Sequence, residues 1–150
     1  MFKEQIAFYC ERLKLSHNMV ENCDKIEAES HEKYLLKLLK LEVEHREESR
    51  KNRFLKNAGF YTLKTFEGYI FDEIKFPQGL TPKDLKDCKF IEEKKNLIFY
   101  GNVGTGKTHL ATAIGVEACK KDYNVKFFRT AALVNRLVEA QGKGVNFLAF

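Results

Sequence analysis

A glycine-rich octapeptide two thirds of the way along the chain carries the residues best suited to chemistry. Residues 101–108 read GNVGTGKT and match the phosphate-loop pattern G-x-x-x-x-G-K-[ST] at every fixed position. In such a loop the backbone N–H groups surround a phosphate, which requires backbone angles and a close approach that glycine tolerates best. The helix expected after the loop points its unpaired N-terminal amides at the same anion. The octapeptide therefore predicts a nucleoside triphosphate site.

The side chains of the loop have distinct expected roles. Lys107 supplies a fixed positive charge for the β- and γ-phosphates, and Thr108 offers its hydroxyl to Mg²⁺. His109 follows directly; a catalytic base is one interpretation, and a first-turn helix residue that packs or hydrogen-bonds locally is the one we favour. The residues expected to bind the cofactor are Gly101, Asn102, Val103, Gly104, Thr105, Gly106, Lys107 and Thr108.

A second group of residues has the chemistry to bind nucleic acid. Arg46, Arg50 and Arg53 recur at i, i+4 and i+7 with Lys51 beside them, so the arginines share one face of an expected helix. Such a face can contact DNA phosphates. The alternative is a solvated face whose arginines pair with acids of the same helix, namely Glu42, Glu47 and Glu48.

Length and composition limit the classes of protein that these residues can serve. The chain has 150 residues, of which 44% are hydrophobic and 31% charged, and this excludes a disordered tail, a collagen-like repeat and a membrane bundle. It carries 26 Lys and Arg against 21 Asp and Glu, a net charge of +5. This mild excess permits a polyanionic partner without requiring one.

Cysteine spacing and the N-terminal residues indicate the compartment. The 4 cysteines contain no C-x-x-C pair and no zinc spacing, so we expect reduced thiols. The first residues lack the apolar core of a signal peptide, and the longest uncharged apolar run, Leu97–Tyr100, is far too short to span a membrane. We therefore expect a cytoplasmic protein without membrane contact.

Three regions follow from the hydrophobic pattern. Residues 1–57 are predicted to form an N-terminal helical domain, with Ser16 and Ser30 as N-caps and Gly59 beyond the final helix. Its apolar stripes are Phe2, Ile6, Tyr9, Cys10 and Leu13, and Leu35, Leu38, Leu39 and Val43. Residues 58–80 are predicted to be an irregular aromatic connector.

Residues 81–150 are predicted to be an incomplete phosphate-loop ATPase domain. Thr81 and Pro82 begin a helix as cap and first-turn proline. A strand at 97–100, buried on both faces, precedes the loop and a helix at 107–120; a strand at 124–128 and a helix from Thr130 follow. The expected fold class is α/β, with a helical arm followed by the first βαβα of a parallel-sheet phosphate-loop domain.

The loop and its flanks resemble a known family. Residues 96–115, NLIFYGNVGTGKTHLATAIG, resemble the phosphate-loop segment of IstB-type transposition helper ATPases, which are relatives of the DnaC-type helicase loaders in the AAA+ group. FIE at 90–92 and NVKFFRTAALVNRLVEA at 124–140 agree with the same family. The resemblance implies that the phosphate-loop domain at 81–150 is AAA+-like. It also implies ATP and Mg²⁺ as cofactors, double-stranded DNA and a transposase as partners, and a homo-oligomer for the full-length family.

The chain also departs from that family's pattern. An ATPase of this kind needs an acid at the end of a later strand to hold Mg²⁺ and order the attacking water. The acids after Thr108 are Glu117, Asp122 and Glu139, and none of them ends an apolar strand. We therefore expect the N-terminal part of a longer protein, without a recognisable Walker B acid, sensor or arginine finger, and no hydrolysis by this chain alone.

Alternative functions remain open at this stage. One is a DnaC-like helicase-loader ATPase that serves replication, with a replicative helicase as partner. Another is a non-hydrolysing remnant that binds DNA or a protein through the helical domain. A small phosphate-loop kinase is disfavoured because the loop begins at residue 101 and leaves too little chain for an acceptor site.

Overall fold

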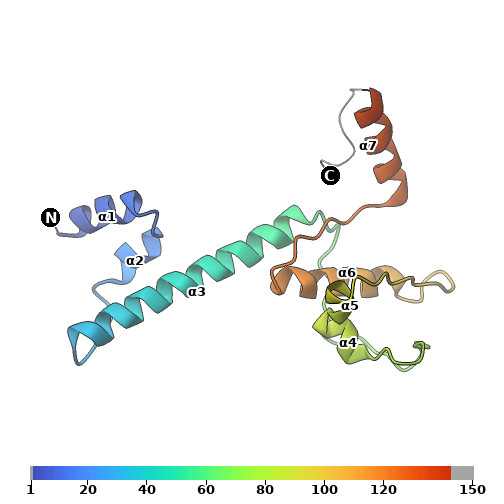
Figure 1. The fold of residues 1–150 in the computed structure, drawn as a ribbon, viewed down its shortest axis with the longest axis horizontal. Helices are drawn as coiled ribbons and strands as arrows, with labels where there is room; N and C mark the ends of the chain where they lie inside the picture. The colour runs from blue at the N-terminus through green and yellow to red at the C-terminus, as the bar shows by residue number, and fades with distance from the viewer. Residues whose placement is uncertain (1, 143–150) are drawn as a thin grey trace. The chain divides into compact units, whose positions relative to one another are not determined.

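The structure is a computed structural model that describes residues 2–142. Within that range the chain forms helices and no strand (Figure 1). It divides into two compact units, the first ending at Arg53 and the second beginning at Phe54. The helices are α1 (Phe2–Arg12), α2 (His17–Asn22), α3 (His31–Asn57), α4 (Pro82–Asp87), α5 (Lys89–Glu92), α6 (Lys107–Lys120) and α7 (Thr130–Gly142).

The first unit has a small core between its helices. Cys10, Met19 and Val20 are buried, and side chains from the helices and from the turn after α1 pack against them, namely Ala7, Leu15 and Leu38. The helical prediction for 1–57 is right in type, but turns at 13–16 and 23–30 divide it into three helices. Ser30 caps α3 as predicted, because its Oγ accepts the Lys33 N–H at 3.2 Å.

A buried carboxylate joins the turn after α1 to α3. Glu42 is 4% exposed and accepts the backbone N–H of Ser16 at 2.9 Å, the Ser16 hydroxyl, and Arg46 Nε at 2.6 Å. Burial acts to raise the pKa of Glu42, but the hydrogen bonds from Ser16 and Arg46 outweigh it and leave that pKa below its usual value. Ser16 therefore stands at the N-cap of α2 while its hydroxyl serves Glu42 instead of the helix.

Most of the predicted apolar stripe in this unit is exposed. Phe2, Tyr9 and Leu13 of the first stripe are each more than half exposed, and so are Leu35 and Val43 of the second. Leu38 is the member of the second stripe that reaches the core. The sequence therefore found the apolar faces, but the first unit leaves much of them uncovered.

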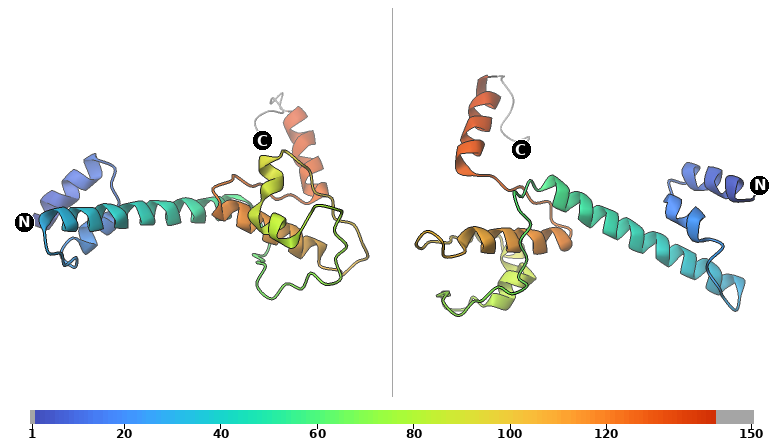
Figure 2. Two further views of the ribbon diagram at one scale, coloured as in Figure 1. Left: turned by 60° about the horizontal axis from the view of Figure 1, so that its bottom comes forward. Right: turned by 180° about the vertical axis from the view of Figure 1, so that it is seen from behind.

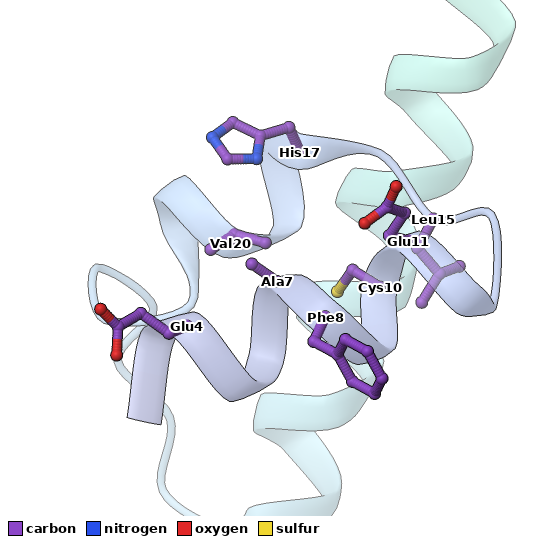
Figure 3. Close-up of a pocket in the computed structure, with 8 residues that line it drawn as sticks. All are labelled: Glu4, Ala7, Phe8, Cys10, Glu11, Leu15, His17 and Val20. Carbon is purple, nitrogen blue, oxygen red and sulfur yellow. The ribbon is translucent and has the colours of Figure 1, made fainter. Parts of the chain in front are cut away.

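A pocket of about 490 Å³ lies between α1 and α2 (Figure 3). Its apolar lining comes from Ala7, Phe8, Leu15 and Val20. Figure 3 shows its polar groups at separate places on the rim rather than gathered at one point, namely Glu4, Glu11 and His17.

In the second unit the helix ends are set by local chemistry. Gly59, at φ +75°, follows the buried Ala58 and ends α3 as predicted. Thr81 and Asp84 form a capping box at the start of α4, with Pro82 in the first turn. Cys88 adopts φ +58° and separates α4 from α5, so the single helix expected after Thr81 is interrupted there.

Helix α6 is the centre of the second unit (Figure 2). Most of its residues are buried, and Leu110 and Ile114 form a cluster with Leu85 of α4. Side chains of the connector, of α5 and of the segment before the loop complete that cluster, namely Phe66, Tyr69, Phe71, Ile74, Phe76, Leu80, Phe90, Leu97 and Phe99. The connector at 58–80 is irregular and aromatic, as its composition indicates.

The predicted α/β fold class is wrong for the described part of the chain, which is all-helical. Residues 97–100 and 124–128 belong to neither a helix nor a strand. Ile98 is 87% exposed and Tyr100 94% exposed, where a strand buried on both faces was expected. The N–H of Phe127 donates to the carbonyl of Ala58 at 2.8 Å, so the second segment meets the end of α3. An apolar pattern shows that a segment can be a strand, but a ladder also needs a partner strand.

The capping box predicts an acid-sensitive contribution to stability. Hydrogen bonds from Thr81 and Lys89 lower the pKa of Asp84 to about 2 from 3.8. Because the folded pKa is the lower one, this contribution is full above about pH 4 and is lost as the pH falls towards 2. We expect Asp84→Asn to lower the melting temperature at pH 6, with a difference from wild type that shrinks between pH 4 and pH 2. A difference that is constant over that range would contradict this role for the carboxylate.

The contact between Gly115 and Phe60 predicts an unusual glycine substitution. A Cβ atom at Gly115 would lie 2.8 Å from Cζ of Phe60. In an open helix Gly→Ala gains about 1 kcal/mol, whereas overpacking costs about 1–3 kcal/mol. We expect Gly115→Ala to lower the free energy of unfolding in urea. In a Phe60→Leu background the same substitution should become neutral or stabilising, and equal effects in both backgrounds would exclude this contact as the cause.

Candidate functional site

The loop at 101–108 has the backbone conformation that its glycines predict. Gly101, Gly104 and Gly106 have φ of +151°, +88° and +79°, values that residues with side chains rarely adopt. Gly106 stands at the N-cap of α6 without a side-chain cap, so the first amides of that 14-residue helix have no such partner. The loop therefore leads directly into a helix N-terminus that no side chain caps.

Lys107 closes the loop on itself. Its ammonium donates to the carbonyls of Gly101 at 3.0 Å and Asn102 at 2.6 Å, and lies 3.4 Å from the Thr105 hydroxyl. The Thr105 hydroxyl donates in turn to the Asn102 carbonyl at 2.9 Å. The predicted cation is therefore held at the mouth of the loop and not directed into bulk solvent.

The remaining predicted loop residues are exposed. Asn102, Val103 and Thr108 are exposed, and the side chain of Val103 is fully accessible to solvent. The carbonyl of Thr108 accepts the Thr112 hydroxyl at 2.8 Å inside α6, while its own hydroxyl stands on the first turn beside Lys107. The eight residues predicted for the cofactor are contiguous in the sequence and lie in the loop and at the start of α6, and their role in binding stays a prediction.

The connector supplies a wall that the sequence did not assign to the site. A cavity of about 690 Å³ lies between the loop and the connector. It is lined by Gly101, Thr105 and Lys107 of the loop, by Leu110 of α6, by residues 98–100, and by connector residues Tyr69, Ile70, Asp72, Glu73, Ile74 and Lys75. The many aromatic residues around Gly68 indicated that the connector packs closely, but they did not indicate that it packs beside the loop.

Tyr69 holds the connector against the start of α6. Its ring lies 4.9 Å from that of His109, and a Cβ atom at Gly106 would come within 3.3 Å of its hydroxyl. Burial raises the pKa of Tyr69 above the ordinary tyrosine value. His109 Nε2 lies 2.9 Å from the carbonyl of Thr65, so this imidazole packs and hydrogen-bonds as expected, but its partners belong to the distant connector and not to its own helix.

The basic residues predicted for nucleic acid lie on α3, but they do not act alike. Arg46 donates through Nε to Glu42 at 2.6 Å and through Nη2 to the carbonyl of Lys14, which is the local-pair alternative. The side chains of Arg50 and Arg53 are exposed, and Lys51 is half-buried. Arg46 therefore has local partners that a phosphate would have to displace.

Other reactive side chains form no centre in the part of the chain that the structure describes. All four cysteines are free, and burial raises the thiol pKa of Cys10, Cys88 and Cys119. Within residues 2–142, no group of three or more His, Cys, Asp or Glu is placed to hold a metal ion. No helix in that range is long and apolar enough to cross a membrane.

Comparison with known proteins gives the family. The sequence profile of the IstB-like ATP binding proteins matches residues 12–148. One relative is the protein of insertion sequence IS5376 from Geobacillus stearothermophilus, whose name describes it as ATP-binding. The two sequences are 32% identical over 149 residues, an alignment that covers 95% of this chain and 59% of that protein. The chain therefore belongs to the family of IstB-like ATP-binding proteins.

Two further relatives are also named as ATP-binding proteins of insertion sequences. The one from IS21 of Pseudomonas aeruginosa is 31% identical over 139 residues, or 87% of this chain and 51% of that protein. The one from IS232 of Bacillus thuringiensis subsp. berliner is 31% identical over 110 residues, or 71% of this chain and 43% of that protein. The chain spans about half the length of these relatives.

The bond between His109 and Thr65 predicts how the wall of the cavity is held. We expect His109→Ala to release the connector and to accelerate hydrogen exchange of the Tyr69 amide, which donates to the carbonyl of Phe66, by at least about tenfold. The matched control is His17→Ala, an exposed histidine of the first unit. If His109→Ala leaves this exchange unchanged, or if His17→Ala changes it as much, the imidazole does not anchor the connector.

Proposed function

We propose that this chain binds ATP with Mg²⁺ through residues 101–108 and serves a transposase on DNA. The observation that carries the proposal is the loop itself, in which three glycines of positive φ lead directly into α6 and Lys107 lies across the mouth. At Gly104 packing does not require a glycine, because a Cβ atom there would meet no atom within 4 Å. Backbone that is open on its inner side is what an approaching phosphate requires.

The residues present fit a triphosphate. The amides of the loop and of the first turn of α6 would hold the β- and γ-phosphates, and Lys107 would transfer its ammonium from the loop carbonyls to phosphate oxygens. Thr108 would hold Mg²⁺ through its exposed hydroxyl. When bound, Mg²⁺ supplies neutralisation of the phosphate charge.

The neighbouring cavity suits the nucleoside. Its volume of about 690 Å³ lies within the range of roughly 300–1,000 Å³ that small-molecule pockets occupy. Ile70 and Ile98 provide exposed apolar surface for a base, and Asp72 and Glu73 provide acceptors for hydroxyl groups. The choice of ATP over GTP is supported by the names of the relatives.

We expect binding without turnover by this chain alone. The acids that line the cavity, Asp72 and Glu73, come from the connector and not from the end of a strand beside the loop. Hydrolysis needs an acid that orders the attacking water next to the γ-phosphate. Two acids after the loop do not line the cavity: Asp122 follows α6, and Glu117 pairs with Lys120 at 2.7 Å.

The partners follow from the relatives and the charge. The relatives are named for insertion sequences, which supports a transposase as partner over a replicative helicase. The exposed apolar side chains of α1 and α3 support assembly of the full-length protein into a homo-oligomer. The net charge of +5 supports a polyanion such as double-stranded DNA.

The test is nucleotide binding by the purified chain. We expect a fluorescent ATP analogue to bind in the presence of Mg²⁺, with an affinity that falls at least about tenfold in Lys107→Ala because the variant has no ammonium to donate to the phosphates. Thr108→Val should lose the dependence on Mg²⁺ while keeping binding in EDTA. The matched control, Lys94→Ala, removes an exposed lysine outside the cavity and should bind as wild type does.

The outcomes distinguish binding from hydrolysis. Equal affinities of wild type and Lys107→Ala would overturn the nucleotide site. Phosphate release by wild type that Lys107→Ala abolishes would leave the site in place and overturn the expectation that this chain does not hydrolyse ATP.

A further inference from the structure

Two segments of the second unit together account for the net positive charge of the whole chain. Residues 54–66 and 123–138 contain no Asp or Glu, and we call the surface that they form the basic–aromatic surface. Its five cations equal the net charge of +5, so the rest of the chain sums to zero. They are Lys56, Lys64, Lys126, Arg129 and Arg136.

The fold joins these two segments, although about 60 positions separate them in the sequence. The N–H of Phe127 donates to the carbonyl of Ala58 at 2.8 Å, and Lys126 Nζ donates to the carbonyl of Asn57 at 2.9 Å. The rings of Phe60 and Phe127 lie 5.7 Å apart. Figure 1 shows the extended segment before α7 passing the end of α3, where these bonds form.

An arginine of this surface is held by an aromatic ring. The guanidinium of Arg129 lies over the ring of Tyr61, 4.0 Å from its centroid. The ring of Tyr61 meets that of Phe127 edge-on at 6.2 Å and 79°, which restrains it in turn. A guanidinium stacked in this way keeps its N–H edges available for a bidentate acceptor, and it loses less freedom when it binds one.

The chemistry of the surface selects its ligand. Arginine held as a planar fork, in two joined segments that contain four further cations and no acid, matches the phosphate groups of a nucleic-acid backbone. The aromatic rings pack on one another and on Arg129, so they do not offer the row of open faces on which single-stranded bases stack. We propose that the basic–aromatic surface binds the phosphate backbone of double-stranded DNA, with Arg129 and Lys126 as its central contacts and Tyr61 as a positioning residue.

This inference deepens the proposed function, since it rests on DNA as a partner and assigns the site that contacts it. It does not depend on the nucleotide. It also differs from the predicted face of α3, where Arg46 already pairs with Glu42. DNA binding and nucleotide binding can therefore fail separately.

The experiment measures binding of the full chain to a fluorescein-labelled 30-base-pair duplex by anisotropy, without nucleotide, from 50 to 300 mM NaCl. We expect the Lys126→Gln/Arg129→Gln variant to bind at least about tenfold more weakly at 100 mM salt. Its plot of log K against log salt should be shallower by about 1.8, or roughly 0.9 for each phosphate that the variant no longer neutralises. Tyr61→Leu should weaken binding although it changes no charge, while Tyr61→Phe should retain it.

Matched controls separate the site from the net charge. Lys83→Gln/Lys94→Gln removes the same charge from exposed positions of the same unit outside the surface, and should weaken binding by less than about twofold. Lys107→Ala should bind DNA as wild type does, even though its affinity for nucleotide is reduced. The melting temperatures of all variants verify that each is folded.

Three results would overturn the proposal. The first is equal weakening by the two double variants, which would reduce the effect to net charge. The second is tighter binding of a 30-nucleotide single strand than of the duplex. The third is retention of duplex affinity in Lys126→Gln/Arg129→Gln while Arg50→Gln/Arg53→Gln loses it, which would return the DNA site to α3.

Discussion

Helix α6 has to keep apolar side chains out of water on almost every side, and the second unit is arranged around that requirement. Eight of its 14 residues are buried, among them Gly115 where the ring of Phe60 leaves no space for a Cβ atom. The segments that cover it are short helices and irregular chain, so its burial depends on aromatic side chains such as Phe66 and Phe71. Because α6 begins at Lys107, directly after Gly106, fixing this helix also fixes the end of the glycine loop.

The same packing creates the candidate site. Covering α6 brings Tyr69 onto His109 and places residues 69–75 opposite the loop, which encloses the cavity of about 690 Å³. The connector therefore stabilises the helix on one side and forms a wall on the other. A change in the packing of the connector at Thr65 or Tyr69 would therefore alter the loop through its contacts with His109 and Gly106, and not through charge.

Charge is distributed unevenly between the functional surfaces. In the first unit Glu42 and Arg46 neutralise each other, and the arginine is committed to holding the turn after α1. In the second unit the joined segments at 54–66 and 123–138 carry cations without acids. Arg46 is thus a structural residue because it pairs with the buried carboxylate of Glu42. The joined segments contain no carboxylate, so their cations suit a phosphate backbone.

The sequence by itself determined the features that depend on neighbours a few residues away. It predicted the glycine loop at 101–108, the caps at Thr81 and Ser30, the end of α3 at Gly59, and the family, because each is set by local backbone angles or by a contiguous motif. Tertiary structure decided the rest. The apolar run at 97–100 forms no strand. Cys88 divides the helix expected after Thr81 into α4 and α5, and Arg46 pairs with Glu42. Each of these features depends on which distant segment supplies a hydrogen-bond partner or a packing surface, and hydrophobic periodicity does not predict that partner.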